Sequence, residues 1–113
     1  MIDRLEAIVA RLKEVDEAVA DPSLARDPGR YREVMRERAR LGVIDEAYRE
    51  YKELLSGIEG AKALFRDEAD PEMREMAREE QKGLELKLAA LEARIKELLV
   101  PRDPLADKSV IME

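Results

Sequence analysis

The apolar residues of this chain recur at intervals of three and four positions, and this spacing constrains the fold more than any other feature. At the start of the chain the intervals alternate between four and three: Met1, Leu5, Ile8, Leu12, Val15 and Val19. A stripe with an average spacing of about 3.5 residues lets helices pack side by side. Charged residues such as Arg4 and Glu6 fill the intervening positions and should stay in water. We therefore expect an amphipathic helix from about Ile2 to Ala20.

Asp-Pro dipeptides mark the predicted starts of the later helices. Proline suits the first position of a helix because it has no amide hydrogen to donate, and a preceding aspartate accepts from the free amides that follow. Asp21-Pro22 and Asp27-Pro28 bound a connector with one short helical turn, and Asp70-Pro71 starts the last helix. Pro101 disfavours helical geometry in the residue before it, so that helix should end near Val100.

The middle of the chain predicts one long helix, from Pro28 to about Arg66. An unbroken helix of this length extends about 60 Å. Each interior glycine, such as Gly60, weakens it by up to about 1 kcal/mol relative to alanine. Ser56-Gly57 is the expected place for a bend. We expect one helix, straight or curved, with this apolar stripe: Tyr31, Val34, Leu41, Ile44, Tyr48, Tyr51, Leu55, Ile58 and Phe65.

The predicted fold is all-α: three long antiparallel amphipathic helices in a coiled-coil-like bundle, with a short extended C-terminal tail. Short turns make successive helices antiparallel, so the first should lie along the beginning of the long helix and the third along its second half. The third helix carries Met73, Ala77, Leu84, Leu88, Leu91, Ile95 and Leu98.

We assign residues 1–100 to the helical domain and 101–113 to a linker and the start of a strand that belongs to the next domain. A single strand is not stable alone. We therefore expect this chain to be the front piece of a longer protein.

Composition excludes several kinds of chemistry. The chain has no cysteine and no histidine, which removes disulfides, thiol catalysis, the commonest general base and the commonest metal ligand. Glu75, Glu79 and Glu80 could be imagined as a metal site, but the di-iron pattern pairs glutamate with histidine, so we assign them to a solvated helix face. We predict no catalytic residue, no cofactor and no metal in this chain.

The charge pattern indicates a cytoplasmic protein. The formal net charge is -6, which argues against uniform attraction to nucleic acid or to anionic lipid. Charged residues stand at the N-terminus where a signal peptide needs an apolar region. No uncharged apolar run approaches the roughly 18 residues that a membrane span needs, so we expect no membrane partner.

The segment 26–40 is the most basic part of the chain, with six arginines against three acids. Arg32, Arg36 and Arg40 stand four positions apart, one above another on a helix face, and each like-charged pair costs a few tenths of a kcal/mol. We call these three residues the arginine column. One interpretation is a contact with RNA phosphate or an acidic protein. The other is a solvated face balanced by Glu33, Glu37 and acids of the first helix.

Tyr48 and Tyr51 lie three positions apart on the predicted apolar stripe. As core residues they supply buried area and need a partner only for the hydroxyl. We expect both in the core, with a recognition surface as the alternative.

Several segments together resemble the N-terminal domain of the bacterial peptide chain release factor 1 family, the class I factors that read UAG and UAA. The segments are 47–55 (AYREYKELL), 61–64 (AKAL), 70–77 (DPEMREMA), 98–104 (LLVPRDP) and 110–113 (VIME), together with the paired Asp-Pro turns near the start. The resemblance covers essentially the whole chain. Each motif alone is weak, but their order and spacing are specific.

The resemblance implies a non-catalytic helical arm on the ribosome, near the stalk base where translational GTPases dock. The implied partners are the ribosome, the release-factor GTPase and ribosomal RNA, with this piece a monomer. The codon-reading tripeptide and the Gly-Gly-Gln loop are both missing from this chain, so no catalytic residue is carried over. The second hypothesis is a free-standing coiled-coil structural adaptor, and the third and weakest is an independent enzyme.

Overall fold

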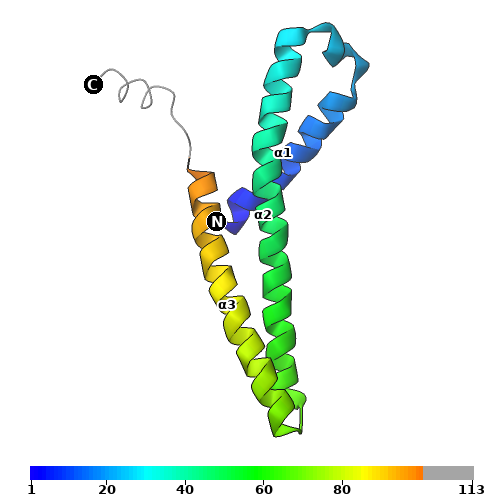
Figure 1. Ribbon diagram of the computed structural model, residues 1–113. Helices are drawn as coiled ribbons and strands as arrows, with labels where there is room; N and C mark the ends of the chain where they lie inside the picture. The colour runs from blue at the N-terminus through cyan, green and yellow to red at the C-terminus, as the bar shows by residue number, and fades with distance from the viewer. Residues whose placement is uncertain (101–113) are drawn as a thin grey trace, which may run out of the picture.

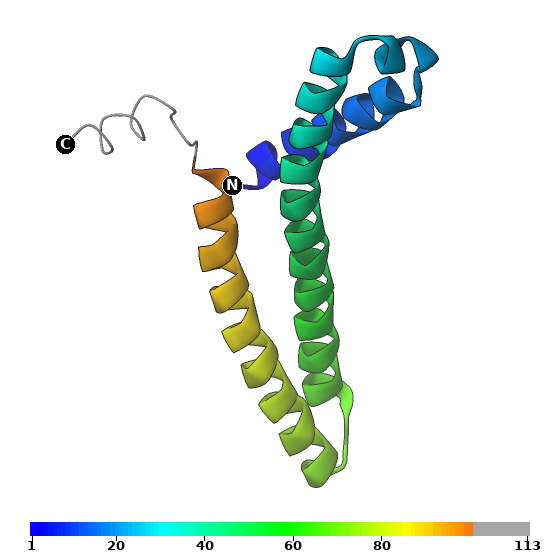
Figure 2. The same cartoon turned by 45° about the horizontal axis from the view of Figure 1, so that its top comes forward.

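The computed structural model describes residues 1–100, which form three long helices and one short one (Figures 1 and 2). Helix α1 spans Ile2–Ala20, the 3-10 helix η1 spans Pro22–Arg26, α2 spans Pro28–Asp67 and α3 spans Pro71–Leu99. These bounds confirm the predicted helices and the short turn in the connector. The predicted linker and strand, residues 101–113, lie outside the described residues. None of the described helices has the length and apolar character that a membrane crossing requires.

Each helix after α1 begins at an Asp-Pro pair whose aspartate caps it. Asp27 accepts a hydrogen bond from the amide of Arg30 at 3.2 Å, and Asp70 accepts one from the amide of Glu72 at 3.1 Å. Asp21 caps η1 in the same way. These hydrogen bonds satisfy amides that have no partner inside the helix, and they confirm the predicted start signals.

Helix α2 is the centre of the fold, and the other two long helices run antiparallel to it on different halves (Figures 1 and 2). As predicted, α1 packs along the N-terminal half of α2 and α3 along its C-terminal half. Leu24 of η1 is buried, and η1 contacts both α1 and α2. The molecule measures 63 × 44 × 19 Å, and its longest dimension is close to the length of α2 alone, about 60 Å.

The three long helices share a core only where the start of α1 and the end of α3 meet the middle of α2. We call this cluster the three-helix junction; its buried residues are Leu5, Ile44, Ala47, Tyr48, Tyr51, Leu91, Ile95 and Leu99. Leu5 is 1% exposed and Ile95 is 0% exposed. Burial of a large apolar side chain contributes about 1.5–3 kcal/mol, so the junction holds both outer helices against α2.

Some residues on the predicted apolar stripes are exposed. Leu55 is 39% exposed, whereas the neighbouring Leu54 packs against the junction. Only α3 lies along the second half of α2, so the buried stripe there is narrow and passes through Leu54 instead. Met1, Tyr31 and Met73 are also exposed. Each stands just before a helix or in its first turn, where the neighbouring helix gives little cover.

Helix α2 is continuous through Ser56-Gly57, where a bend was the expected weakness. Gly57 faces α3, because a Cβ placed there would lie 3.2 Å from Cδ1 of Leu84. The missing side chain therefore allows α3 to pack closely at this point, and it does not interrupt the helix.

Candidate functional site

The arginine column lies on the N-terminal half of α2. Arg32, Arg36 and Arg40 are all exposed, and Nε of Arg32 donates to the backbone oxygen of Pro28 at 3.4 Å. Within residues 1–100, none of the three forms an ion pair with an acid. The column therefore presents its positive charge to solvent.

Other charges of the basic segment are paired with α1. Nε of Arg38 lies 2.6 Å from Oδ1 of Asp16. Glu37 accepts two hydrogen bonds from Arg11, at 2.9 and 2.8 Å. These hydrogen bonds lower the pKa of the Glu37 carboxyl against the opposing effect of burial, and the charge of Arg40 adds a smaller lowering. Glu37 and Asp16 thus form their ion pairs with Arg11 and Arg38, and the column acts on Glu37 only through the more distant charge of Arg40.

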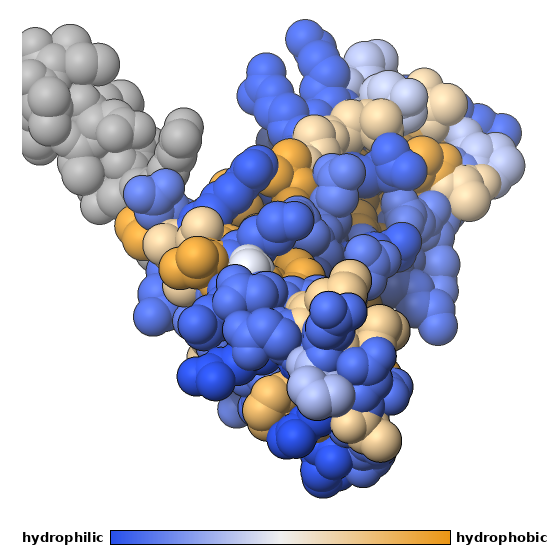
Figure 3. All heavy atoms as spheres, turned by 60° about the horizontal axis from the view of Figure 1, so that its bottom comes forward, coloured by the Kyte–Doolittle hydropathy of each residue, from blue (hydrophilic) through white to orange (hydrophobic). Residues whose placement is uncertain are grey.

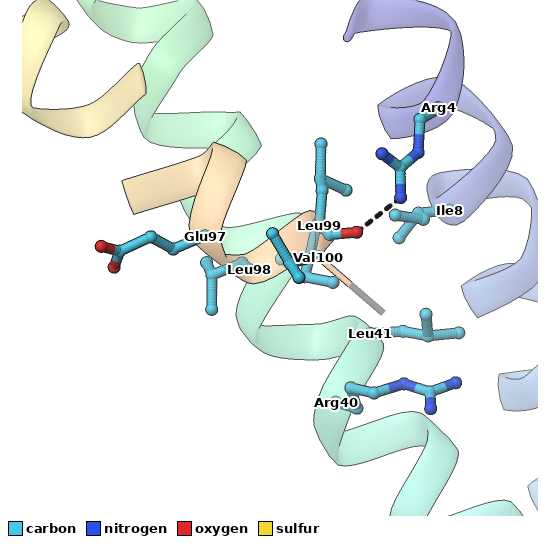
Figure 4. Close-up of a pocket in the computed structure, with 9 residues that line it drawn as sticks. Arg4, Ile8, Arg40, Leu41, Glu97, Leu98, Leu99 and Val100 are labelled. Carbon is cyan, nitrogen blue, oxygen red and sulfur yellow. Dashed lines mark hydrogen bonds between the residues drawn. The ribbon is translucent and has the colours of Figure 1, made fainter. Parts of the chain in front are cut away.

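A groove opens where the column meets the three-helix junction (Figure 4). We call it the junction groove; it has a volume of about 590 Å³ and is lined by Arg4, Ile8, Arg40, Leu41, Ile44, Glu97, Leu98, Leu99 and Val100. Figure 4 shows the apolar side chains of Ile8 and Leu41 between Arg4 and Arg40, while Glu97 points away from them. The groove therefore has an apolar floor with a cationic rim.

Arg4 is a groove residue that the sequence pattern assigned only to solvent. Its guanidinium donates to the backbone oxygen of Leu99 at 2.5 Å. That oxygen lies at the C-terminal end of α3, where carbonyls lack helical partners and the helix dipole favours a cation. The two residues are 95 positions apart, so no local pattern could have predicted the contact.

Polar groups connect the three helices at the junction. The hydroxyl of Tyr48 donates to Glu6 of α1, and the hydroxyl of Tyr51 donates to Glu92 of α3 at 3.1 Å. The hydrogen bond to Glu6, burial and the charge of Glu6 raise the pKa of Tyr48 to about 12. The ammonium of Lys52 lies 4.2 Å from the ring centroid of Tyr48. Both tyrosines are buried, which confirms their predicted place in the core.

The three glutamates that could be imagined as a metal site are exposed. Glu75, Glu79 and Glu80 all face solvent on α3, and residues 1–100 contain no group of His, Cys, Asp or Glu side chains that could hold a metal ion. Figure 3, which views the molecule from the α2–α3 turn, shows hydrophilic residues over most of this face, with small apolar patches between them. The arginine column and the junction groove are thus the candidate site.

Comparison with known families identifies the class to which this helical arm belongs. The model of the PCRF domain matches residues 8–113. The chain therefore belongs to the PCRF domain family.

Several relatives of the chain are named peptide chain release factor 1. The relative from Cytophaga hutchinsonii is 43% identical, that from Bacillus cytotoxicus 42%, and that from Listeria monocytogenes serotype 4a 44%. Each alignment covers 100% of this chain and 32% of the relative, so the chain spans about a third of their length. No solved structure matches the chain. These identities confirm the resemblance found in the sequence.

Proposed function

We propose that this chain is the N-terminal helical domain of a cytoplasmic peptide chain release factor. The whole factor would recognise UAA and UAG stop codons and promote peptidyl-tRNA hydrolysis on the ribosome. The observation that carries the proposal is the identity of 42–44% over the entire chain to proteins named peptide chain release factor 1. Within the factor this domain makes contacts and supplies no catalytic group.

A release assay on the full-length protein tests this assignment. Ribosomal complexes carrying formylmethionyl-tRNA are programmed with UAA, UAG, UGA or a sense codon, and released formylmethionine is measured. We expect release on UAA and UAG only. Equal release on sense codons, or none on either expected stop codon, would show the assignment to be wrong.

We further propose that the arginine column contacts the ribosome near the stalk base, where ribosomal RNA and the release-factor GTPase are the neighbours. Support comes from the exposure of Arg32, Arg36 and Arg40 and from the absence of ion pairs to them within residues 1–100. The three arginines also lie near one end of α2, which is about 60 Å long. This position suits a contact made at a distance from the rest of a factor.

Changing all three column arginines to glutamine in the full-length factor should weaken ribosome binding, with the largest loss at low salt. Cations that bind phosphate release counterions, so the slope of log affinity against log salt should fall by about 0.7–0.9 for each phosphate that the variant no longer neutralises. The matched control changes three exposed arginines elsewhere to glutamine: Arg66, Arg78 and Arg94. If both triple variants bind as the parent does at every salt concentration, the column has no role on the ribosome.

The free-standing coiled-coil adaptor is not favoured, because the chain uses its apolar seams internally. Leu5 and Val15 of α1 are 1% and 2% exposed, and Ile58 of α2 is 5% exposed. We expect sedimentation of this chain to give a monomer. A dimer that grows with concentration would support the adaptor.

A further inference from the structure

The face of α2 that α3 covers continues beyond the end of α3. In the second half of α2 the covered face includes Ile58 and Ala61, which are 5% and 4% exposed. Counting back in steps of three and four residues keeps the same side of a helix. The positions reached are Leu54, Tyr51, Ala47, Val43, Arg40, Arg36 and Arg32.

Burial along this face ends where α3 ends, at Leu99. Ala47 is 6% exposed beside the last turns of α3, whereas Val43 is 43% exposed. Arg40 and Arg36 follow and are exposed. Among residues 1–100, no element covers this continuation of the face.

The junction groove opens directly onto this uncovered face, because Arg40 belongs to both (Figure 4). Its apolar lining includes Ile8 and Leu98, which are half-buried, and Val100, which is 63% exposed. An apolar floor of this kind offers nothing to a phosphate backbone, whereas it suits the apolar side chains of a protein segment. The groove and the column thus form one continuous surface, apolar at one end and basic along the other.

No acid among residues 1–100 forms an ion pair with Arg32, Arg36 or Arg40. Glu97 points away from Arg40 (Figure 4), and Asp16 and Glu37 are bound by Arg38 and Arg11. The full chain carries a net charge of -6 although segment 26–40 has six arginines and three acids. The acids elsewhere in the chain therefore disfavour an extended polyanion that continues beyond the column, whereas a short acidic segment meets the column alone.

We propose that the junction groove and the arginine column form a docking surface for an acidic amphipathic helix of a protein partner. Apolar side chains of that helix lie in the groove, and its carboxylates pair with Arg40 and Arg36. Arginines four positions apart repeat about every 6 Å along α2, and carboxylates four positions apart on a second helix repeat at the same interval. This inference builds on the proposed function by naming the kind of partner that the column binds.

A synthetic peptide probes the surface with the full 113-residue chain. The peptide is a fluorescent helix of about 18 residues, long enough to span the groove and the column, with leucines on one face and glutamates every fourth position beside them. We expect micromolar binding by fluorescence anisotropy. A peptide with glutamine for glutamate, and another with serine for leucine, should each bind at least about tenfold more weakly.

Exposed residues of the chain provide variants with matched controls. Arg36→Gln with Arg40→Gln should weaken binding of the glutamate peptide about tenfold. Arg66→Gln with Arg78→Gln makes the same charge change at exposed positions near the α2–α3 turn and should leave binding unchanged. Val100→Ser should weaken binding several-fold, while Leu86→Ser, a change at a residue that is 75% exposed, should not. Far-UV circular dichroism verifies that all variants are folded.

Three results would overturn the proposal. The first is that no glutamate peptide binds, or that binding is indifferent to the column and groove variants. The second is that an RNA hairpin binds the chain more tightly than the peptide does, that the column variant weakens hairpin binding and that Val100→Ser leaves it unchanged. This result would make the surface an RNA site. The third is that Val110→Ser with Ile111→Ser raises peptide affinity at least about tenfold, which would identify residues 101–113 as the occupant. Because no ribosome is present, failure here is distinct from failure of codon-dependent release.

Discussion

Two glycines of α2, three positions apart, should respond differently to the same substitution. A Cβ at Gly60 would meet no atom within 4 Å, whereas a Cβ at Gly57 would lie 3.2 Å from Cδ1 and 4.0 Å from Cδ2 of Leu84. Neither glycine has a positive φ, so alanine fits the backbone at both positions. The pair therefore separates helix propensity from packing against α3.

The magnitudes follow from these surroundings. Alanine is favoured over glycine in a helix interior by about 1 kcal/mol, and Gly60→Ala should gain this in full. At Gly57 the added methyl group requires Leu84 to move by a few tenths of an ångström, and overpacking costs about 1–3 kcal/mol. We expect Gly57→Ala to be neutral or destabilising by up to about 2 kcal/mol, which is the packing cost less the gain in propensity.

Thermal and urea unfolding followed by far-UV circular dichroism measure the difference. For a domain of this size a gain of about 1 kcal/mol raises Tm by roughly 4–8 °C, provided that unfolding is two-state. A double-mutant cycle adds Leu84→Ala, in whose background Gly57→Ala should recover the gain of about 1 kcal/mol. Failure of Gly60→Ala to stabilise, or equal stabilisation by Gly57→Ala with and without Leu84, would refute this reasoning.

Two further predictions concern the three-helix junction. Ile95→Ala should destabilise the chain by about 2–5 kcal/mol, because Ile95 is 0% exposed between three helices. Leu86→Ala changes a residue that is 75% exposed and should alter the free energy of unfolding by no more than about 0.5 kcal/mol in the same urea titration. Equal effects of the two substitutions would contradict the assigned core. The pKa of Tyr48 is raised from 10.0 to about 12 in the folded chain. The stabilisation that the protonated Tyr48 hydroxyl gives to the folded state is therefore fully present below pH 10 and is lost as pH rises through 12. Tyr48→Phe should therefore flatten the fall in stability across this alkaline range, and an unchanged profile would exclude the contribution.

The helix boundaries were predictable because their causes are local. Each Asp-Pro pair places a capping carboxylate and a preset backbone within the same few residues, and the structure confirms the starts at Pro28 and Pro71. The burial of Tyr48 and Tyr51 was also predictable, since both lie on the stripe that recurs at helical spacing. The antiparallel order followed from the short turns that join the helices.

Which side of each helix is covered depended on its neighbours. Leu54 and Leu55 are indistinguishable as apolar residues, and the line of α3 across α2 decides that Leu54 is the one more buried. Gly57 was expected to weaken α2, and only the position of Leu84 shows that it permits close packing.

Part of the candidate site was likewise predictable from the sequence, and part of it depended on the tertiary structure. The sequence by itself determined the arginine column, because Arg32, Arg36 and Arg40 share a face of any helix that contains them. Only the tertiary structure decided that Arg38 pairs with Asp16, that Arg4 reaches Leu99, and that a groove opens beside Arg40. Helical periodicity and capping act within a few residues, whereas these contacts join segments between 22 and 95 positions apart, which only the packing of α1 and α3 on α2 brings together.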